Sequence, residues 1–417
     1  MKVIVIGGGA AGMMAAITAS TQGNDVLLIE KTDSLGNKLK ITGKGRCNLT
    51  FAGDSEDFKN NVVKNYRFLY SSFNNFDNND TIDFFEKLGV KTKIERGNRV
   101  FPVSDDANEV VSALKEKLKQ QRVKILFNSS VANIILNENS LIGVKLDNGE
   151  KIYCEKCILA TGGMSYSTTG STGDGYTISK NVGHSIEKLL PGLVPLKSSD
   201  SICKKLQGLT LKNIRYSLFD LDIKKNIYED FGELMFAHFG ITWPVVLSSS
   251  SILNRYDNVS EKLKQGKICA IIDLKPALDE KTLDKRICRD FDKNSNKEFK
   301  NSLNDLLPQK LIPQIIIMSG IEENKKVHQI TKEERKRIVK CIKSLTIKIN
   351  NLMPLEFAII TCGGINVKEV NPKTMESKII KNLYFAGEVL DIDAYTGGYN
   401  LQIAFSTAVA AGSNNEM

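Results

Sequence analysis

The chain has 417 residues, of which 41% are hydrophobic and 25% are charged. This length exceeds what one compact core holds, so we expect two or three domains. The 57 basic and 48 acidic residues give a net charge of +9, which fits a solvated surface or a polyanionic partner such as RNA. No apolar run in the sequence approaches the roughly 18 residues of a membrane-spanning helix, so we expect no membrane association.

Eight cysteines are scattered singly, apart from the pair Cys154 and Cys157. Residues three apart on a strand point to opposite faces and no second pair completes four ligands, so we expect no metal site. The N-terminus carries one lysine before a strand, which argues against a cleavable signal peptide. We therefore expect free thiols and a cytoplasmic location.

The first thirty residues carry the strongest signal in the chain. An apolar strand, Val3–Ile6, runs into a GxGxxG pattern at Gly7–Gly12, and a helix follows over Met13–Ser20. The glycines allow a tight turn and close approach of a pyrophosphate, which the helix N-terminus then binds. A second strand, Val26–Ile29, ends in Glu30, whose carboxylate is spaced to bind a ribose diol. The pattern predicts a dinucleotide site.

The rest of the first half continues as an α/β unit. Alternation and turn residues predict a helix over 107–121, strands over 123–127, 131–136, 142–146 and 157–160, and a helix over 176–182 after a glycine-rich stretch.

The middle of the chain changes character after Pro191. Residues 192–270 look β-rich and residues 276–345 look helical, with a capping box at Thr331–Glu334 and a basic helix face. Residues 345–350 read as a strand that returns to the β-rich part. From Phe357 the α/β pattern resumes, with a strand over 383–386 and a terminal helix that Gly397-Gly398 opens.

We therefore expect an α/β protein whose nucleotide-binding domain is split by an insertion. The predicted domains are residues 1–190 with 355–417, an inserted β-rich domain of 191–275 with 344–354, and a helical subdomain of 276–343.

The C-terminal segment favours FAD over NAD. Tyr384-Phe385-Ala386-Gly387-Glu388 is a second strand with a glycine and an acid, and a helix start follows at Gly398. In two-part flavin domains such an acid approaches the ribityl chain, and the helix N-terminus faces the flavin edge that gains negative charge. Since the chain has one GxGxxG unit, NADH or NADPH would dock only transiently as electron donor.

Four longer motifs mark a family resemblance. They are Gly43-Lys44-Gly45-Arg46-Cys47-Asn48-Leu49-Thr50, Ala160-Thr161-Gly162-Gly163, Thr374-Met375-Glu376-Ser377-Lys378, and Phe385–Asp391 continuing through Thr396–Gln402. In these the chain resembles the BaiN/RdsA-like NAD(P)/FAD-dependent oxidoreductases over essentially its whole length. The resemblance implies a split Rossmann-type FAD domain related to the fumarate-reductase and glutathione-reductase folds, with a β-barrel-like insertion and a small helical subdomain. It also implies reduction of conjugated C=C bonds, in bile-acid enones or in a uridine of 23S ribosomal RNA.

With the motifs, the resemblance implies a set of cofactor-binding residues spread over both ends of the chain. They are Gly7, Gly9, Ala10, Ala11, Gly12, Glu30, Lys31, Lys38, Gly43, Gly45, Arg46, Val131, Ala160, Thr161, Gly162, Gly387, Glu388, Asp391, Gly398, Asn400 and Leu401.

Reduction of a conjugated C=C bond needs a hydride, a proton and a group that polarises the carbonyl. Arg46 is predicted to hold a substrate oxygen, Cys47 to deliver the proton, and Asn48 to bond a flavin or substrate carbonyl. His238 is a further candidate catalytic residue. The alternatives are that Arg46 and Asn48 only bind cofactor, that Cys47 only packs, and that His238 is structural.

The chain departs from the family pattern at three places: Phe51, Ala237 and the only tryptophan, Trp243. The substrate therefore stays open between a ribosomal RNA uridine, which the net charge favours, and a small cyclic enone. An FAD-dependent amine oxidase is a further alternative.

Overall fold

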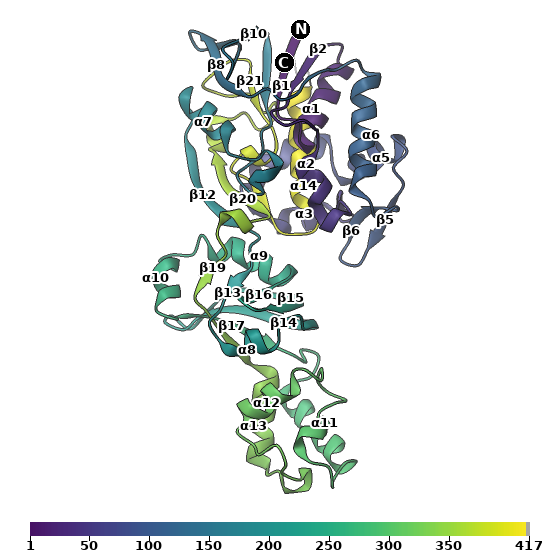
Figure 1. Cartoon of the computed structure of the whole chain (residues 1–417), viewed down its shortest axis with the longest axis vertical. Coiled ribbons are helices and arrows are strands. Elements are labelled where there is room, and N and C mark those ends of the chain that lie inside the picture. Colours follow the sequence, from purple (N-terminus) through teal and green to yellow (C-terminus); the bar gives the residue numbers. More distant parts are fainter. Residues whose placement is uncertain (414–417) are drawn as a thin grey trace. The chain divides into compact units, whose positions relative to one another are not determined.

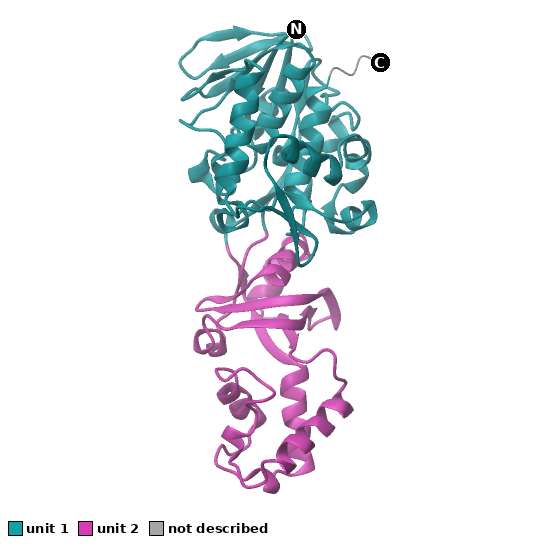
Figure 2. Cartoon of the chain, turned by 90° about the vertical axis from the view of Figure 1, so that its right-hand side faces the viewer, with its two compact units in different colours: residues 1–192, 354–417 teal, residues 193–353 magenta. Residues whose placement is uncertain are grey.

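The computed structural model describes residues 1–413. The chain forms two compact units, Met1–Gly192 with Pro354–Met417 (unit 1) and Leu193–Met353 (unit 2) (Figure 2). Each unit has its own buried apolar core. The division of the insertion into a β-rich domain and a helical subdomain stays a prediction.

Unit 1 is built on a five-stranded parallel sheet (Figure 1). Its strands are β1 (Lys2–Ile6), β2 (Asp25–Ile29), β7 (Lys124–Leu126), β11 (Lys156–Leu159) and β21 (Leu383–Phe385), in the order β21-β11-β1-β2-β7. Residues 3–6 of β1 are all buried, which explains their unbroken apolar run, because parallel strands are covered on both faces. The predicted Rossmann-type α/β fold is confirmed.

Two helices that open at glycines pack beside each other on this sheet. They are α1 (Ala10–Thr21) and the terminal helix α14 (Tyr399–Gly412), and α6 (Ala107–Gln120) also contacts α1. The first and last segments of unit 1 therefore share one core.

Antiparallel strands surround the parallel sheet. β8 (Val131–Asn137), β9 (Ser140–Leu146) and β10 (Lys151–Tyr153) form a meander, and β12 (Ile186–Gly192) pairs with β20 (Ile360–Ile365). The helix after the glycine-rich stretch, α7 (Asp174–Asn181), begins two residues earlier than the sequence predicts.

The segment between residues 37 and 102 contains short elements that the sequence patterns did not predict. They are α2 (Asn37–Ile41), η1 (Thr42–Gly45), β3 (Thr50–Phe51), α3 (Ser55–Asn61), β4 (Val62–Lys64), α4 (Tyr66–Asn75), α5 (Asn78–Lys87), β5 (Thr92–Glu95) and β6 (Arg99–Pro102). Phe51, where the chain departs from the family pattern, packs in an aromatic cluster. Its buried ring stacks on Phe58 at 5.7 Å between centroids, and its centroid lies 4.7 Å from that of the Tyr399 ring.

Shorter elements complete unit 1. They are β22 (Asp393–Ala394), which pairs with β4, and the 3-10 turns η2 (Ser167–Thr169), η5 (Leu355–Phe357), η6 (Val367–Glu369) and η7 (Gly387–Val389).

Unit 2 contains a seven-stranded antiparallel sheet. The strands are β13 (Leu196–Lys197), β14 (Thr210–Asp220), β15 (Lys225–Ala237), β16 (Gly240–Thr242), β17 (Ile268–Asp273), β18 (Leu345–Ile349) and β19 (Asn351–Leu352), in the order β18-β17-β14-β15-β16-β13-β19. The chain passes from β18 at one edge to β19 at the other with only Asn350 between them. One continuous segment therefore pairs with both ends of the sheet and curls it into a barrel-like form, as predicted for residues 345–350.

The helices of unit 2 are α8 (Ser201–Lys205), α9 (Pro244–Leu253), α10 (Val259–Lys264), α11 (Glu280–Asp292), α12 (Ile312–Ser319) and α13 (Lys332–Lys343), with 3-10 turns η3 (Phe299–Asn301) and η4 (Val327–Gln329). Three of these helices, α11, α12 and α13, lie in the predicted helical segment 276–345, whereas α8, α9 and α10 lie within residues 192–270, which the sequence predicts to be β-rich. The capping box at the start of α13 is present: the Glu334 amide donates to Thr331 Oγ1 at 3.2 Å and the Thr331 amide donates to Glu334 Oε2 at 2.8 Å.

Candidate active site

The turn between β1 and α1 is shaped by its glycines. Gly7 has φ +102°, and a Cβ there would lie 2.6 Å from the carbonyl oxygen of Ala160. Gly9 is the N-cap of α1, and no atom lies within 4 Å of where its Cβ would be in the part of the chain that the structure describes. The first backbone bond of α1 runs from Met13 N to Gly9 O, so the amides of residues 10–12 (Ala10, Ala11 and Gly12) are available at this open face. This arrangement fits a pyrophosphate.

Glu30 is held against this turn. Its Oε2 accepts the Gly8 amide at 2.6 Å, and its Oε1 accepts the amide and the hydroxyl of Thr32 at 2.8 Å each. Each carboxylate oxygen can accept two hydrogen bonds, so Oε2 keeps one position for a ligand hydroxyl. Glu30 thus shapes the turn and can bind a ribose at the same time.

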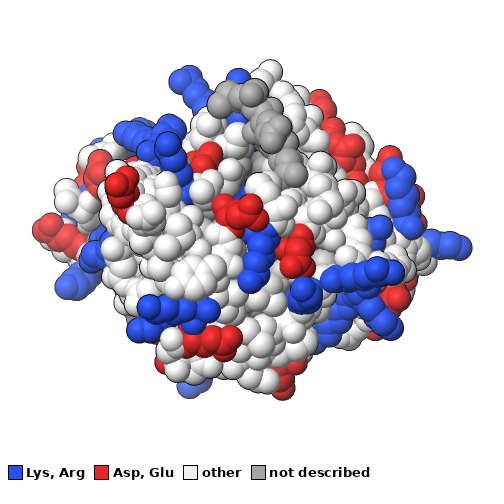
Figure 3. Space-filling view, turned by 90° about the horizontal axis from the view of Figure 1, so that it is seen from above, with Lys and Arg blue, Asp and Glu red and all other residues white. Residues whose placement is uncertain are grey.

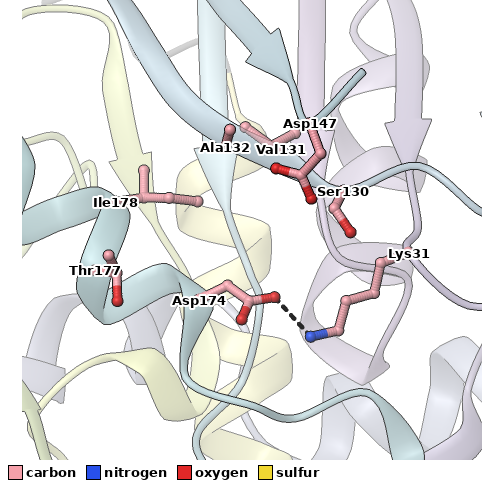
Figure 4. Close-up of a pocket in the computed structure, with 8 residues that line it drawn as sticks. All are labelled: Lys31, Ser130, Val131, Ala132, Asp147, Asp174, Thr177 and Ile178. Atoms are coloured by element: carbon pink, nitrogen blue, oxygen red, sulfur yellow. Dashed lines mark hydrogen bonds and ion pairs between the residues drawn. The ribbon is translucent and has the colours of Figure 1, made fainter. Parts of the chain in front are cut away.

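A pocket of about 410 Å³ opens beside Lys31, the residue that follows Glu30 in the chain (Figure 4). It is lined by Lys31, Ser130, Val131, Ala132, Asp147, Asp174, Thr177 and Ile178. Lys31 Nζ lies 2.6 Å from Asp174 Oδ2 at the start of α7. The structure therefore brings the predicted cofactor residues Lys31 and Val131 to one cavity at the ends of β2 and β8, where an adenosine would extend from the turn. Helix α7 contributes Asp174, Thr177 and Ile178 to the lining of this pocket. The sequence patterns did not single out these residues, although a glycine-rich stretch precedes the helix.

The segment after β11 supplies a polar group that needs a partner. Gly162 has φ +71°, and Thr161 Oγ1 is buried without a hydrogen-bond partner among residues 1–413. Buried hydroxyls in native proteins are almost always bonded. An unpaired one beside the glycine turn fits a site that a cofactor completes.

Lys38 and Glu388, both predicted cofactor residues, form an ion pair across 350 residues of sequence. Lys38 Nζ lies 2.7 Å from Glu388 Oε2 and donates to Ser165 Oγ at 2.6 Å. Glu388 Oε1 also accepts the Thr361 amide at 2.8 Å. This network joins α2, the loop after β11, β20 and η7.

Asp391 is buried and neutralised by a lysine that the sequence did not single out. Lys64 Nζ lies 2.7 Å from Asp391 Oδ2, and Asn65 Nδ2 donates to the Asp391 carbonyl at 2.6 Å. Gly387, with φ +77°, donates its amide to Thr407 Oγ1 at 2.9 Å. These bonds anchor η7 to β4 and to α14.

The loop that contains the predicted catalytic residues is strongly curved. Gly43, Lys44 and Gly45 have φ of +57°, +61° and +83°, and Cys47 has φ +59°. The Cys47 amide donates to the Thr42 carbonyl at 3.0 Å, which closes the loop. The Cys47 side chain is fully buried, and this burial raises the pKa of its thiol to about 12.

Arg46 is already paired within the chain. Its Nε donates to Asp105 Oδ1 at 2.8 Å, its Nη2 bonds Glu95, and its guanidinium lies 4.2 Å from the centre of the Phe101 ring. The hydrogen bond to Glu95, followed by that to Asp105, raises the Arg46 pKa. Glu95 and Asp105 were missed, because the sequence offers no signal that pairs them with residue 46.

Asn48 links the loop to the start of α14. In the amide orientation that satisfies its neighbours, Asn48 donates to the carbonyls of Thr50 and Val100 at 3.1 Å each and accepts the Gly398 amide at 3.0 Å. Gly398 has φ +99° and contacts Thr50 so closely that a Cβ there would collide with the Thr50 backbone. The loop and the helix N-terminus are therefore one rigid assembly.

The other two predicted residues of this helix differ in their contacts. Asn400 accepts the Ala394 amide at 3.0 Å and donates to the Ala394 carbonyl at 2.8 Å, so its side chain holds β22. Leu401 is half-buried. Whether either touches a cofactor stays a prediction.

His238 belongs to unit 2. It is exposed in the two-residue turn between β15 and β16, with its ring edge-on to Phe239 at 5.1 Å. Trp243 is the N-cap of α9 and has φ +91°, a conformation that favours glycine. The catalytic role of His238 stays a prediction.

Comparison with known proteins identifies the family. A family model described as the HI0933-like protein Rossmann domain matches residues 1–414. The chain belongs to this family. It is an FAD-dependent oxidoreductase with a Rossmann-type FAD-binding domain, so the resemblance seen in the sequence motifs is confirmed. The glycine turn, Glu30 and the unpaired Thr161 hydroxyl fit the adenosine and pyrophosphate of FAD.

Two curated relatives span almost all of this flavoprotein. A 3-dehydro-bile acid delta(4,6)-reductase of Clostridium scindens is 29% identical over 99% of this chain and 98% of its own. A ribosomal RNA dihydrouridine synthase of Escherichia coli is 28% identical over 98% of this chain and 96% of its own. Among solved structures, 3-ketosteroid delta1-dehydrogenase of Sterolibacterium denitrificans covers 98% of both chains with a TM-score of 0.52 at 12% identity, a likeness of fold alone.

Two features, a membrane-spanning helix and a metal-binding cluster, are absent from the residues that the structure describes. Among residues 1–413, no helix is both long and apolar enough to cross a membrane. In the same range, no three or more His, Cys, Asp or Glu side chains are grouped so that they could hold a metal ion.

Proposed function

We propose that this flavoprotein uses NADH or NADPH to reduce a C=C bond conjugated to a carbonyl group. The support is the pair of relatives that match 98–99% of the chain, a bile-acid delta(4,6)-reductase and a ribosomal RNA dihydrouridine synthase. Both names describe the addition of hydrogen across such a bond. A reaction common to two relatives with such different substrates is the best inference for this chain.

Bound FAD, once reduced, supplies the hydride for this reaction. The protein must then supply the proton, and Cys47 is our candidate donor. Burial raises the pKa of its thiol to about 12, so Sγ carries its proton at neutral pH but is a weaker acid than a group with a pKa near 7. The curved backbone from Gly43 to Cys47 holds the thiol in place.

Arg46 is the candidate that polarises the substrate carbonyl. Its guanidinium has five N–H donors, and the ion pairs with Glu95 and Asp105 keep it charged and oriented. A substrate oxygen would take one of the remaining donors or replace one carboxylate. Asn48 acts as a positioning residue, because its amide already bonds Gly398, Thr50 and Val100.

Two substrate classes follow from the two relatives: a uridine of 23S ribosomal RNA and a small cyclic enone. The net charge of +9 favours RNA. Mass spectrometry of ribosomal RNA nucleosides from a deletion strain decides between them. Loss of dihydrouridine in 23S RNA supports the RNA substrate, and unchanged dihydrouridine moves the assignment to an enone.

The chemistry is tested on the purified protein. Anaerobic NADH or NADPH should bleach the flavin absorbance band, slowly, because the chain encodes one nucleotide-binding unit. Addition of a conjugated enone or of an RNA transcript should then restore the band. If neither nucleotide bleaches the flavin while an amine does, the chain is an amine oxidase and the proposal is wrong.

A further inference from the structure

We propose that two rows of basic side chains on α11 and α13 form a surface that binds the phosphate backbone of RNA. The choice of RNA rests on the proposed function, whereas the surface itself rests on geometry and charge. The rows consist of Lys281, Lys285 and Arg289 on α11 and of Lys332, Lys336 and Lys340 on α13. We call them the basic rows.

The spacing within each row follows the helix. Residues four apart are separated by about 6 Å along the axis and lie on one face, so each row is a stripe of three cations that turns by about 80° around the helix. The row on α11 lies opposite the buried residues Leu283, Ile287 and Phe291. The row on α13 lies away from Ile338 and Ile342 in the same way. Both rows therefore face solvent.

The six cations are free to bind a ligand. All six residues are exposed, and among residues 1–413 none of their side chains forms an ion pair or a hydrogen bond. Two neighbouring acids are paired with other cations, while Glu280, Asp292 and Glu333 are exposed on the same helices. Asp290 Oδ2 lies 2.8 Å from Arg286 Nε, and Glu334 Oε1 lies 2.8 Å from Lys325 Nζ.

The two helices are fixed to each other. Arg335 Nε of α13 lies 2.6 Å from Asp284 Oδ1 of α11, and the helices pack together (Figure 1). The basic rows are therefore carried on one rigid pair of helices, which lowers the entropy lost when both bind one strand.

The surrounding charge distribution singles out this region. Residues 276–343 contain 16 basic and 11 acidic side chains, so this segment carries more than half of the net charge of the chain. In the view of Figure 3, by contrast, basic and acidic side chains are interspersed. A strongly anionic ligand would thus be drawn to the helices of unit 2.

The composition of the two helices favours a phosphodiester backbone over a membrane. A helix that lies on a membrane needs apolar side chains on its exposed face. Every exposed position of α11 and α13 carries a polar or charged residue: Glu280, Lys281, Thr282, Lys285, Arg289, Asp292, Lys332, Glu333, Lys336, Arg337 and Lys340. Spaced single cations suit a backbone that repeats one negative charge per nucleotide.

The test compares three triple variants of the full-length FAD-loaded protein. Two remove one basic row each, K281A/K285A/R289A and K332A/K336A/K340A. The third, K119A/K145A/K151A, removes three exposed lysines of unit 1 and serves as matched control. The probe is a fluorescein-labelled single-stranded RNA of mixed sequence, followed by anisotropy over a salt series. Unchanged melting temperature and FAD content show that each variant folds.

Each row variant should lower the slope of log K against log salt by about 2, because each lost phosphate contact on single strands contributes roughly 0.7. Affinity near 0.1 M salt should fall about 100-fold, because a slope change of about 2 acts over the one decade of salt below 1 M, with the control variant close to wild type. The surface is refuted if the row variants bind RNA as tightly as the control, or if no protein binds. Row-dependent binding to phosphatidylglycerol vesicles without RNA binding would identify a membrane partner and also refute it.

This experiment separates the two proposals. RNA binding through the basic rows, with no reduction of any conjugated C=C bond, contradicts the proposed function and leaves the surface intact. Reduction of an enone by a protein that does not bind RNA contradicts the surface alone.

Discussion

The side-chain carbonyl of Gln402 accepts a hydrogen bond of 2.7 Å from the hydroxyl of Thr50, 352 residues earlier in the chain. The same oxygen accepts the Thr81 hydroxyl at 2.8 Å, and the amide nitrogen donates to the Phe76 carbonyl at 3.1 Å and to Ser406 Oγ at 3.0 Å. Every hydrogen-bonding position of this buried amide is used. Gln402 thereby fixes β3, which contacts Gly398, to α14.

Replacing Gln402 by methionine should destabilise unit 1. The change keeps the length of the side chain but leaves the Thr50 hydroxyl buried without its acceptor, at a cost of about 1–3 kcal/mol, whereas the Thr81 hydroxyl can still donate to the Asp77 carbonyl at 3.0 Å. Thermal unfolding and FAD release measure the effect. Thr81→Val removes one of the four bonds and should have a smaller effect. Equal melting of Gln402→Met and wild type would show that the network is dispensable.

The Gly398 turn should tolerate no side chain. Gly398→Ala combines a left-handed φ with a collision against the Thr50 backbone, so we expect loss of FAD binding or of folding. Gly23→Ala is the matched control, because Gly23 has φ +80° but nothing described lies within 4 Å of its Cβ position. The control should cost only about 1–2 kcal/mol. Similar losses of stability and FAD binding in both variants would show that the left-handed backbone conformation, and not the contact with Thr50, causes the whole effect.

Glu30→Gln should weaken FAD binding. The amide keeps the shape of the carboxylate, but in either orientation its NH₂ group faces a backbone donor, the amide of Gly8 or that of Thr32. One of these two hydrogen bonds is therefore lost. The loss of about 1–3 kcal/mol corresponds to roughly 5- to 150-fold in Kd. Fluorescence titration of the apoprotein with FAD measures it. Glu155→Gln, at the other end of β1 where Glu155 accepts the Lys2 amide at 2.6 Å, should leave Kd unchanged.

Cys47→Ala tests the proposed proton donor. We expect flavin reduction by NAD(P)H to persist while reduction of the C=C substrate slows by about 100-fold or more. Because the pKa of the buried thiol is about 12, its protonated form prevails throughout the neutral range. Titration of Cys47 should therefore cause no fall in the wild-type rate between pH 6 and pH 9. The pH profiles of wild type and Cys47→Ala should have the same shape in this range. A variant that turns over like wild type would leave Cys47 a packing residue.

His184 should make unit 1 sensitive to acid. Its ring is buried, with Nδ1 3.2 Å from Glu369 Oε2 and Nε2 2.8 Å from Ser377 Oγ. Burial lowers the His184 pKa, and Glu369 opposes the shift only in part. The unfolded chain therefore binds this proton more readily. Neutral His184 contributes fully to the stability of the folded protein above the pKa of about 6.5 that histidine has in the unfolded chain. This contribution is lost as the pH falls towards the lower pKa of His184 in the folded protein.

Denaturant unfolding at pH 7.5 and pH 5.5 measures this effect. Wild type should lose more stability between the two values than His184→Gln, which cannot take up the proton. His328→Gln is the control, since His328 is exposed. An equal loss in wild type and His184→Gln would contradict the assignment.

The local parts of the site could be predicted from the sequence, and the long-range parts could not. Gly7, Gly9 and Glu30 lie within thirty residues, where the pattern of strand, turn and helix fixes their relation. The pairing of Arg46 with Glu95 and Asp105 depends on how β5 and β6 fold back onto the loop, and no periodicity encodes it. The resemblance to a family supplied Lys38 and Glu388 separately, but only the structure shows their ion pair.

The strand that closes the sheet of unit 2 also brings the ends of that unit together. β13 near its start pairs with β19 near its end, and the Met353 amide donates to the Pro195 carbonyl at 3.0 Å. For the folding of unit 1, the whole insertion therefore acts as a short loop, since loop-closure entropy depends on the flexible length between fixed ends. A variant in which a few glycines replace residues 195–353 should therefore still be a yellow, FAD-binding protein. The excised segment should fold alone.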